Sequence, residues 1–504
     1  MRTRKAIKNL LFYTLQQLTL IISNFFMPPI LVSNYGSAVN GLVQTIRQII
    51  NYVQLTGAGI ANASVVAMYK PITQNDYKTL SGIYNATDAL FLKAGNIFSI
   101  ICFIVAVIYP LTLDGEVPYL TVALLVIVMG ISGASEFYMC GKYQAIINAH
   151  QESYIVGIAQ MVGNLTNMFF LFFLTFLNQS IVVVQLGMSS IYVLRILILH
   201  YYVKRKYTFL IKEEKPLFDR ITQRRGAIVH QISTLVVLGS STIIVSVLRG
   251  LREASIFTVY YMIFSGINML CTIVSNTIYT SFGDVIARGE KKILKDAFNI
   301  YEFVFLIIIT VVFVSTYVLI MPFVKIYTAN MTDTNYYLPF LALMFIIVGI
   351  ANNVRVPYLT LVNGAGHFLE TKNRAIIEMV INVTGQIGFG YFFGMYGVLL
   401  GSICSFGYRT LDFIFYANHK IAEQSVKKSF FRIIINILVG IVIAVLLKHV
   451  MVFDPSGYIQ WMLYAFVICI ESAIIVLGIN AWIDKKSFLE CLSILKGLFK
   501  RKNA

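Results

Sequence analysis

Polar and charged side chains recur on one face of an apolar run near the start of this 504-residue chain. Arg47, Asn51 and Gln54 follow one another at helical spacing, which places them on one side of a helix. A guanidinium group offers a planar fork of N–H donors that fits a phosphate or a carboxylate at two points. A charge inside the membrane needs water or a partner, so we expect this face, with Arg47 on it, to line a water-filled cleft. The alternative is hydrogen bonding between helices in a dry bundle, where amide side chains are common.

Three further arginines are candidates to line the same cleft. Arg249 and Arg252 lie at the outer end of an apolar run, and Arg355 precedes Pro357 in another. A proline interrupts the hydrogen-bond ladder of a helix, and interrupted membrane helices line the binding sites of many transporters. The alternative for Arg355 is a long side chain that extends to the headgroup layer, and both interpretations stay open.

Two carboxylates are candidates for coupling transport to an ion or a proton. Glu136 has no cation close to it in the sequence, and it is therefore the first candidate. Asp412 follows Arg409 by three residues, so it shares a helix face with that arginine and can simply neutralise it.

The sequence contains no pattern that is typical of a catalytic, metal or cofactor site. The six cysteines form no C-x-x-C pair, and the six histidines form no H-E-x-x-H motif. The loops expected on the outer side are too short to hold an active site. We therefore expect no enzymatic activity, no metal and no cofactor.

The composition excludes a soluble protein. Hydrophobic residues make up 58% of the chain and charged residues only 12%, whereas a soluble domain carries roughly 25% charged residues. The apolar runs are continuous rather than alternating, which indicates helices and not the strands of a membrane barrel. We expect an all-α polytopic membrane protein.

About fourteen apolar segments are long enough to cross a bilayer as helices. The first six lie near residues 10–32, 39–68, 88–110, 118–147, 154–177 and 180–203. Six more lie near residues 231–249, 254–281, 300–324, 337–363, 374–394 and 396–417. The last two lie near residues 430–451 and 459–482.

Lysine and arginine are concentrated in alternate loops between these segments. The loop near residues 204–229 holds many of them, whereas the loops of opposite orientation are nearly bare. The positive-inside rule then places both termini in the cytoplasm and explains most of the net charge of +17 without nucleic acid as a partner.

The chain repeats itself at an offset of 214 residues. Residues 182–206 align without a gap on residues 396–420, with identities that include Gly187/Gly401 and Arg195/Arg409. The same offset pairs Gly36 with Gly250 near the start of each copy. A repeat of six spans is even, so both copies enter the membrane in one orientation and are related by an axis along its normal.

This repeat defines the expected domains. We expect an N-lobe at 1–203, a cytoplasmic linker at 204–229, a C-lobe at 230–420, and two further spans with a basic cytoplasmic tail at 421–504. The polar face that holds Arg47 in the N-lobe has a copy in the C-lobe, and Asn268 of that copy is a further candidate ligand. The residues of the copy are Tyr261, Ser265, Asn268, Thr272 and Asn276.

Four short segments resemble a known family. They are residues 34–42 (NYGSAVNGL), the glycines at 57 and 59, residues 68–71 (MYKP) and residues 396–402 (YGVLLGS). In this order, with fourteen spans and a six-plus-six repeat, the chain resembles a Wzx-type polysaccharide repeat-unit flippase. That family lies within the multidrug/oligosaccharidyl-lipid/polysaccharide exporter superfamily. Many relatives carry an acid early in span seven, where this chain has Ser240, Ser241 and Thr242. A coupling role at that position is therefore not carried over.

The resemblance implies movement of an undecaprenyl-diphosphate-linked oligosaccharide from the inner to the outer leaflet of a bacterial cell membrane, by alternating access. The partners it implies are this lipid-linked substrate, the bilayer and a polysaccharide polymerase. A diphosphate entering from the cytoplasm would meet Arg355 first and Arg47 later. The alternatives are an ion-coupled multidrug exporter of the same superfamily and a membrane polysaccharide polymerase.

Overall fold

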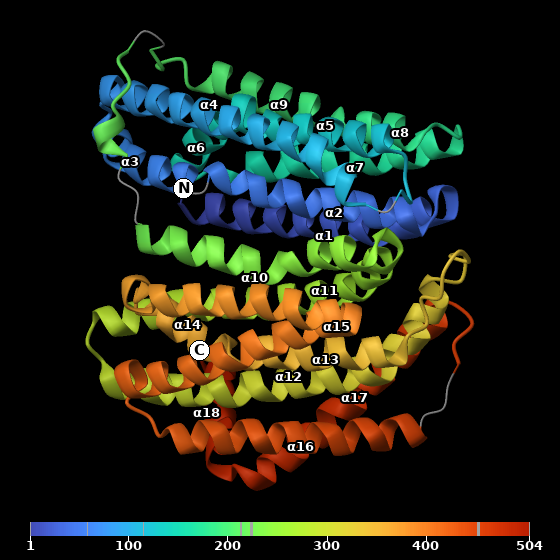
Figure 1. Cartoon of the computed structure of the whole chain (residues 1–504). Coiled ribbons are helices and arrows are strands. Elements are labelled where there is room, and N and C mark those ends of the chain that lie inside the picture. The colour runs from blue at the N-terminus through green and yellow to red at the C-terminus, as the bar shows by residue number, and fades with distance from the viewer. Residues whose placement is uncertain are drawn as a thin grey trace. The chain divides into compact units, whose positions relative to one another are not determined.

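The structure is a computed structural model that describes residues 2–57, 59–113, 115–211, 214–221, 225–450 and 454–502. In these residues all regular secondary structure is helical. The chain divides into two compact units, Met1–Val259 and Tyr260–Ala504. Figure 1 shows the helices coloured along the chain.

In the first unit the apolar runs form long helices, because a helix satisfies every backbone polar group within the hydrocarbon layer. α1 packs against α7, and α4 packs against α5. The helices are α1 (Arg2–Tyr35), α2 (Ser37–Val53), η1 (Gln54–Gly57), α3 (Ile60–Gln74), α4 (Tyr77–Ile108), η2 (Tyr109–Thr112), α5 (Tyr119–Ser135), η3 (Glu136–Cys140), α6 (Gly141–Ala149), α7 (Ser153–Phe176), α8 (Ile181–Ser189), α9 (Ile191–Lys206), η4 (Phe218–Arg220) and α10 (Arg225–Arg249).

The second unit begins within α11, whose first residues belong to the first unit. α12 packs against α13, α16 and α17. The helices are α11 (Leu251–Ala287), α12 (Lys291–Tyr327), α13 (Pro339–Val354), α14 (Val356–Gly364), α15 (Phe368–Ala417), η5 (Asn418–Ala422), α16 (Val426–Val450), α17 (Tyr458–Ile483) and α18 (Lys485–Lys502).

Twelve helices in the described residues are long and apolar enough to cross a membrane. Two of the fourteen expected spans are not among them as separate helices. α15 contains two spans, which meet at Gly394 with φ 63° and ψ −142°. The expected span 39–68 is interrupted between α2 and α3, and the pieces have only 17 and 15 residues, short of the roughly 20 of a typical span. The expected architecture is confirmed, and the chain is a multi-pass membrane protein.

The repeat is visible in the backbone of both copies. α2 follows Gly36 (φ 84°) and α11 follows Gly250 (φ 88°), 214 residues later. Asn75 (φ 54°) and Gly289 (φ 71°), just before α4 and α12, have the same separation. The helix ends that the sequence repeat predicts are therefore formed in both copies.

The interruption of the fourth span also recurs. In the first unit α5 continues through the π-helical turn η3 into α6, which begins at Gly141. In the second unit α13 ends at Val354, and Arg355 separates it from α14. Gly141 and Arg355 are equivalent under the repeat, so both copies depart from regular α-helix close to the same position of this span.

The first half of the expected linker lies against α4. Leu217 N donates to Gly82 O at 3.0 Å, and Ile211 N donates to Ser81 Oγ at 3.0 Å. Asn85 Nδ2 donates to Ile211 O at 3.2 Å and to Glu214 O at 2.8 Å. Lys212 and Arg224 of this segment lie outside the described residues. Whether 204–229 separates two moving lobes stays a prediction.

Candidate functional site

Arg47 lies on α2, and its side chain is half-buried. Its Nη1 donates to Asn24 Oδ1 at 3.4 Å, and its Nη2 lies 2.8 Å from Met27 Sδ. Among the residues that the structure describes, no carboxylate oxygen lies within 4.0 Å of this guanidinium group. A cation inside a membrane protein without a carboxylate is an available site for an anion.

The neighbouring candidates of the first unit are accessible. Asn51 is exposed, and Gln54 is half-buried in η1, where α2 ends. The helix resumes after Gly59 (φ 82°), a left-handed conformation that suits glycine. Arg249 and Arg252 are exposed on either side of Gly250, at the junction of α10 and α11.

Glu136 has a cationic partner that is distant in the sequence. Arg195 Nη1 on α9 lies 2.9 Å from Glu136 Oε2, and Gln144 Nε2 donates to Oε1 at 2.5 Å. Glu136 opens the π-helical turn η3, and such turns are frequent at functional sites. The carboxylate is therefore neutralised in this state, and its role in coupling stays a prediction.

Arg355 lies between α13 and α14 and is buried, with 8% of its surface exposed. Its Nη1 forms an ion pair with Glu378 Oε1, and its Nη2 donates to Asn352 Oδ1 at 2.8 Å. The guanidinium carbon lies 4.6 Å from the centre of the Phe406 ring, a cation–π contact. The side chain thus ends on partners that are buried within the unit.

Glu378 and Asp412 join Arg355 to two more arginines of α15. Arg409 Nε lies 3.3 Å from Glu378 Oε2, and Arg409 Nη1 lies 2.7 Å from Asp412 Oδ2. Arg374 Nη1 lies 2.7 Å from Asp412 Oδ1. We call these five residues the arginine cluster; with three cations and two carboxylates it carries one net positive charge. The expected neutralisation of Arg409 by Asp412 is formed.

Asn268 is connected to this cluster through amides of α13. Its Oδ1 accepts from Asn352 Nδ2 at 3.1 Å and from Asn353 Nδ2 at 2.6 Å. Asn352 in turn accepts from Arg355. The side chain of Asn276, on the same predicted face, lies outside the described part of the chain. Hydrogen bonding between helices thus accounts for Asn268 in this state, and a sugar hydroxyl would have to replace one of these amides.

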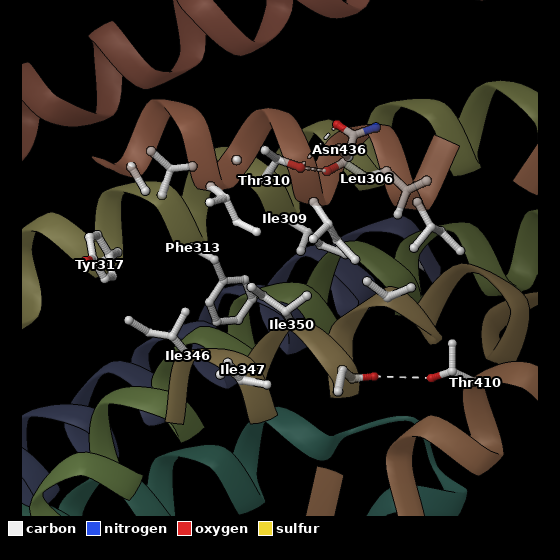
Figure 2. A pocket seen from close by; sticks show the side chains of 18 of the residues that line it. Leu306, Ile309, Thr310, Phe313, Tyr317, Ile346, Ile347, Ile350, Thr410 and Asn436 are labelled. Carbon is white, nitrogen blue, oxygen red and sulfur yellow. Dashed lines mark hydrogen bonds between the residues drawn. The ribbon is translucent and has the colours of Figure 1, made fainter. Parts of the chain in front are cut away.

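An apolar groove lies beside the arginine cluster in the second unit. It has a volume of about 740 Å³ and is formed by α12, α13, α15 and α16. Figure 2 shows Phe313, Ile346 and Ile350 directed into it. Leu343, Ile347 and Ile441 are lining residues that are also exposed at the surface of the unit, so the groove opens outward.

The groove and the cluster share helices. Val354 lines the groove and Arg355 follows it on the chain. Thr410 also lines the groove, next to Arg409 of the cluster, and its Oγ1 donates to Ala351 O of α13 at 3.3 Å (Figure 2). Sequence reasoning did not find the groove, because its residues look like any other apolar helix surface.

No protein-family model and no curated protein sequence matches the chain. Solved structures do. An inward-facing multidrug-resistance MATE family transporter of the MOP superfamily matches 84% of this chain and 99% of its own, at 16% identity and a TM-score of 0.64. The lipid II flippase MurJ, in an inward closed conformation, matches 94% of this chain and 99% of its own, at 14% identity and a TM-score of 0.64. The chain has the MOP transporter fold.

A third structure of the MOP fold is similar as well. A MOP superfamily transporter from Pyrococcus furiosus matches 83% of this chain and 95% of its own, at 14% identity and a TM-score of 0.56. The fold that the resemblance implies is confirmed. The match to MurJ extends over more of this chain than either of the other two matches does.

Proposed function

We propose that this protein is a flippase that moves an oligosaccharide linked to undecaprenyl diphosphate from the inner to the outer leaflet of a bacterial cell membrane. One observation carries the proposal: the arginine cluster and the apolar groove lie side by side, along α15 and at the end of α13, which Arg355 follows. A substrate that fits both has an anionic head joined to a long apolar tail.

The diphosphate is the part of such a lipid that hydrocarbon excludes most strongly. Arginine binds it well because the guanidinium fork contacts two phosphate oxygens at once. The cluster has one cation more than it has carboxylates, and Arg47 of the first unit has no carboxylate within 4.0 Å in the described residues. The amides near each arginine suit sugar hydroxyls. An isoprenoid tail would stay in contact with the apolar groove.

The comparisons support this substrate class. One of the similar structures is a lipid II flippase, and its match covers 94% of this chain against 84% for the multidrug transporter. A multidrug exporter of cationic compounds is the alternative, and it would need unpaired carboxylates. In the described residues, Glu136, Glu378 and Asp412 are each paired with arginine.

Transport in liposomes tests the proposal. Purified protein is reconstituted with undecaprenyl-diphosphate-linked oligosaccharides, and a membrane-impermeant glycosidase measures how fast the sugar changes leaflet. We expect movement faster than in protein-free liposomes, and loss of most of it in the Arg47→Ala/Arg355→Ala double variant. Protein that moves a cationic dye but leaves several such lipids at the protein-free rate would favour the multidrug alternative.

A further inference from the structure

Glu378 is an anion of the protein itself that already pairs with Arg355. The two side chains form a buried ion pair, and each is only 9% exposed. In the described residues Arg355 has no second carboxylate within 4.0 Å, and its other hydrogen bond goes to the neutral amide of Asn352. Arg355 thus cannot bind a diphosphate fully until Glu378 gives way.

The cluster is arranged so that Glu378 can give way. Arg409, its other partner, is also paired with Asp412 at 2.7 Å. If the Glu378 carboxylate turned from Arg355 toward Arg409, it would keep a cation, and Arg355 alone would be left without an anion. Since an unpaired buried charge is costly, this exchange is favourable only when another anion takes the place of the carboxylate.

We propose, building on the function above, that Glu378 is a resident anion that makes the site selective for the diphosphate over the headgroups of ordinary phospholipids. A bilayer presents monoanionic phosphodiesters in large excess, and these would occupy a bare buried arginine. A monoanionic phosphodiester would only replace the single negative charge of Glu378 at Arg355 with another single negative charge, which yields no net electrostatic gain. A diphosphate brings more than one charge and more acceptor oxygens, so it can satisfy Arg355 and also use the net positive charge of the cluster.

Anion binding to the purified full-length protein tests the role of Glu378. The probes are inorganic pyrophosphate and dimethyl phosphate, a monoanionic diester with the charge of a phospholipid phosphate, and calorimetry gives their Kd values. We expect wild type to bind pyrophosphate in clear preference. Glu378→Gln should bind dimethyl phosphate about tenfold or more tighter than wild type, since removal of a buried competing charge changes affinity by this order. The ratio of the two Kd values should fall accordingly.

A matched control is available in the same unit. Glu302 is also a buried glutamate paired with an arginine, Arg432, at 2.6 Å, but it lies outside the cluster. Glu302→Gln should keep the wild-type ratio of Kd values. Glu378→Asp, which keeps the charge but shortens the side chain, should give an intermediate ratio. It supplies the same test if Glu378→Gln does not elute as a folded protein.

Two outcomes would overturn this role. One is a folded Glu378→Gln variant with the wild-type ratio, and the other is the absence of binding of either anion to wild type and variant alike. The proposed function can fail separately. If the selectivity changes as expected but lipid-linked oligosaccharides do not move in liposomes, Glu378 guards an anion site that belongs to another transported lipid or solute.

Discussion

Arg47 and Arg355 both hold a guanidinium group inside the protein, but the partners of the two groups differ. Arg47 is held by an amide oxygen and a thioether, whereas Arg355 is held by a carboxylate. A charge at mid-membrane costs roughly 3 kcal/mol or more without water or a partner. An arginine that keeps no carboxylate therefore destabilises the protein, unless a substrate or water satisfies it.

Replacing Arg47 should impair transport more than folding. We expect Arg47→Ala to lower the rate of flipping about tenfold or more, because one charge-assisted contact to the diphosphate is lost. Arg47→Lys should restore part of the rate, since lysine keeps the charge but not the two-point fork. The liposome assay measures the rates, and equal amounts of folded protein are the control. Wild-type rates for Arg47→Ala would assign this arginine a structural role only.

Replacing Arg355 should impair stability as well as transport. Arg355→Ala leaves the buried Glu378 with Arg409 alone, and breaking a buried ion pair in this way costs about 3–5 kcal/mol. Arg288→Ala is the control, because its pair with Asp284 is exposed and worth only about 0.3–0.5 kcal/mol. Thermal unfolding in detergent compares the two. Equal shifts in the two variants would contradict the buried character of the Arg355 pair.

Asp484, just after α17, predicts a dependence of stability on pH. Burial raises the pKa of its carboxyl, but hydrogen bonds from Arg432 and Ser487 outweigh that effect and hold the pKa below its ordinary value of 3.8. The stabilisation is therefore present above that ordinary value and is lost as the pH falls through the lower pKa of the folded state. At pH 7, Asp484→Asn should lower the stability by about 2 kcal/mol. Thermal melts from pH 7 down to pH 3 should show the two proteins converging, and a constant difference would contradict the ion pair.

The residue types of the site were predictable, but their partners were not. The polar spacing of Arg47, Asn51 and Gln54 was visible because helix periodicity is local. The pair of Glu136 with Arg195 joins residues 59 positions apart, so no local pattern contains it. Glu378 follows Arg374 by four residues, so local spacing places these two on one helix face, whereas the fold pairs Glu378 with Arg355 and Arg409.

At the scale of elements, α15 shows how two membrane helices pack by small residues. Its two arms meet closely near Gly401, where an added Cβ would lie 2.2 Å from Gln386 N. Buried amides and hydroxyls then link the arms: Asn382 Nδ2 donates to Ser405 Oγ at 2.8 Å, and Gln386 Nε2 donates to Ser402 Oγ at 2.9 Å. This hairpin carries Glu378 and Asp412, the carboxylates that pair with the three arginines of the cluster. Its packing therefore positions the arginine cluster.

A methyl group at Gly401 should separate the arms. Gly401→Ala is expected to destabilise the protein by about 1–3 kcal/mol, the usual cost of overpacking. It should also weaken pyrophosphate binding, because Arg409 moves with its arm. Gly388→Ala is the control on the same helix, since its Cβ would have no atom within 4 Å. Thermal melts and calorimetry report both effects, and equal behaviour of the two variants would refute the close approach.

The position of a helix end could be predicted from the sequence where a glycine stands at that end. Gly36 and Gly250, equivalent in the repeat, both adopt positive φ before a helix. The interruption after α2 was missed although Gly57 and Gly59 stand there, because the run of residues 39–68 is apolar enough to suggest one continuous span. An added Cβ on Gly57 would lie 2.4 Å from the Phe137 ring, a contact between distant segments that no local pattern contains.

For the whole molecule, the distribution of cations predicts the orientation in the membrane. Lys215, in the cation-rich loop, should face the cytoplasm, and Gly115, in a loop of opposite orientation, should face outward. In a background without the native cysteines, a membrane-impermeant maleimide should label Gly115→Cys in intact cells. Lys215→Cys should react only after the cells are lysed. Labelling of Lys215→Cys in intact cells would reverse the topology.

The position of the boundary between the compact units bears on how the protein is made. α10 and the start of α11 pack within the first unit: Tyr52 Oη donates to Val236 O at 3.1 Å, and Asn40 Nδ2 donates to Ser255 Oγ at 2.7 Å. During synthesis, the first six spans therefore enter the membrane before the surfaces that complete their unit exist. A nascent chain paused in the 204–229 loop would expose the α2 amides and hydroxyls to lipid, where insertion chaperones and membrane proteases act. We therefore expect efficient biogenesis to depend on rapid delivery of residues 225–259.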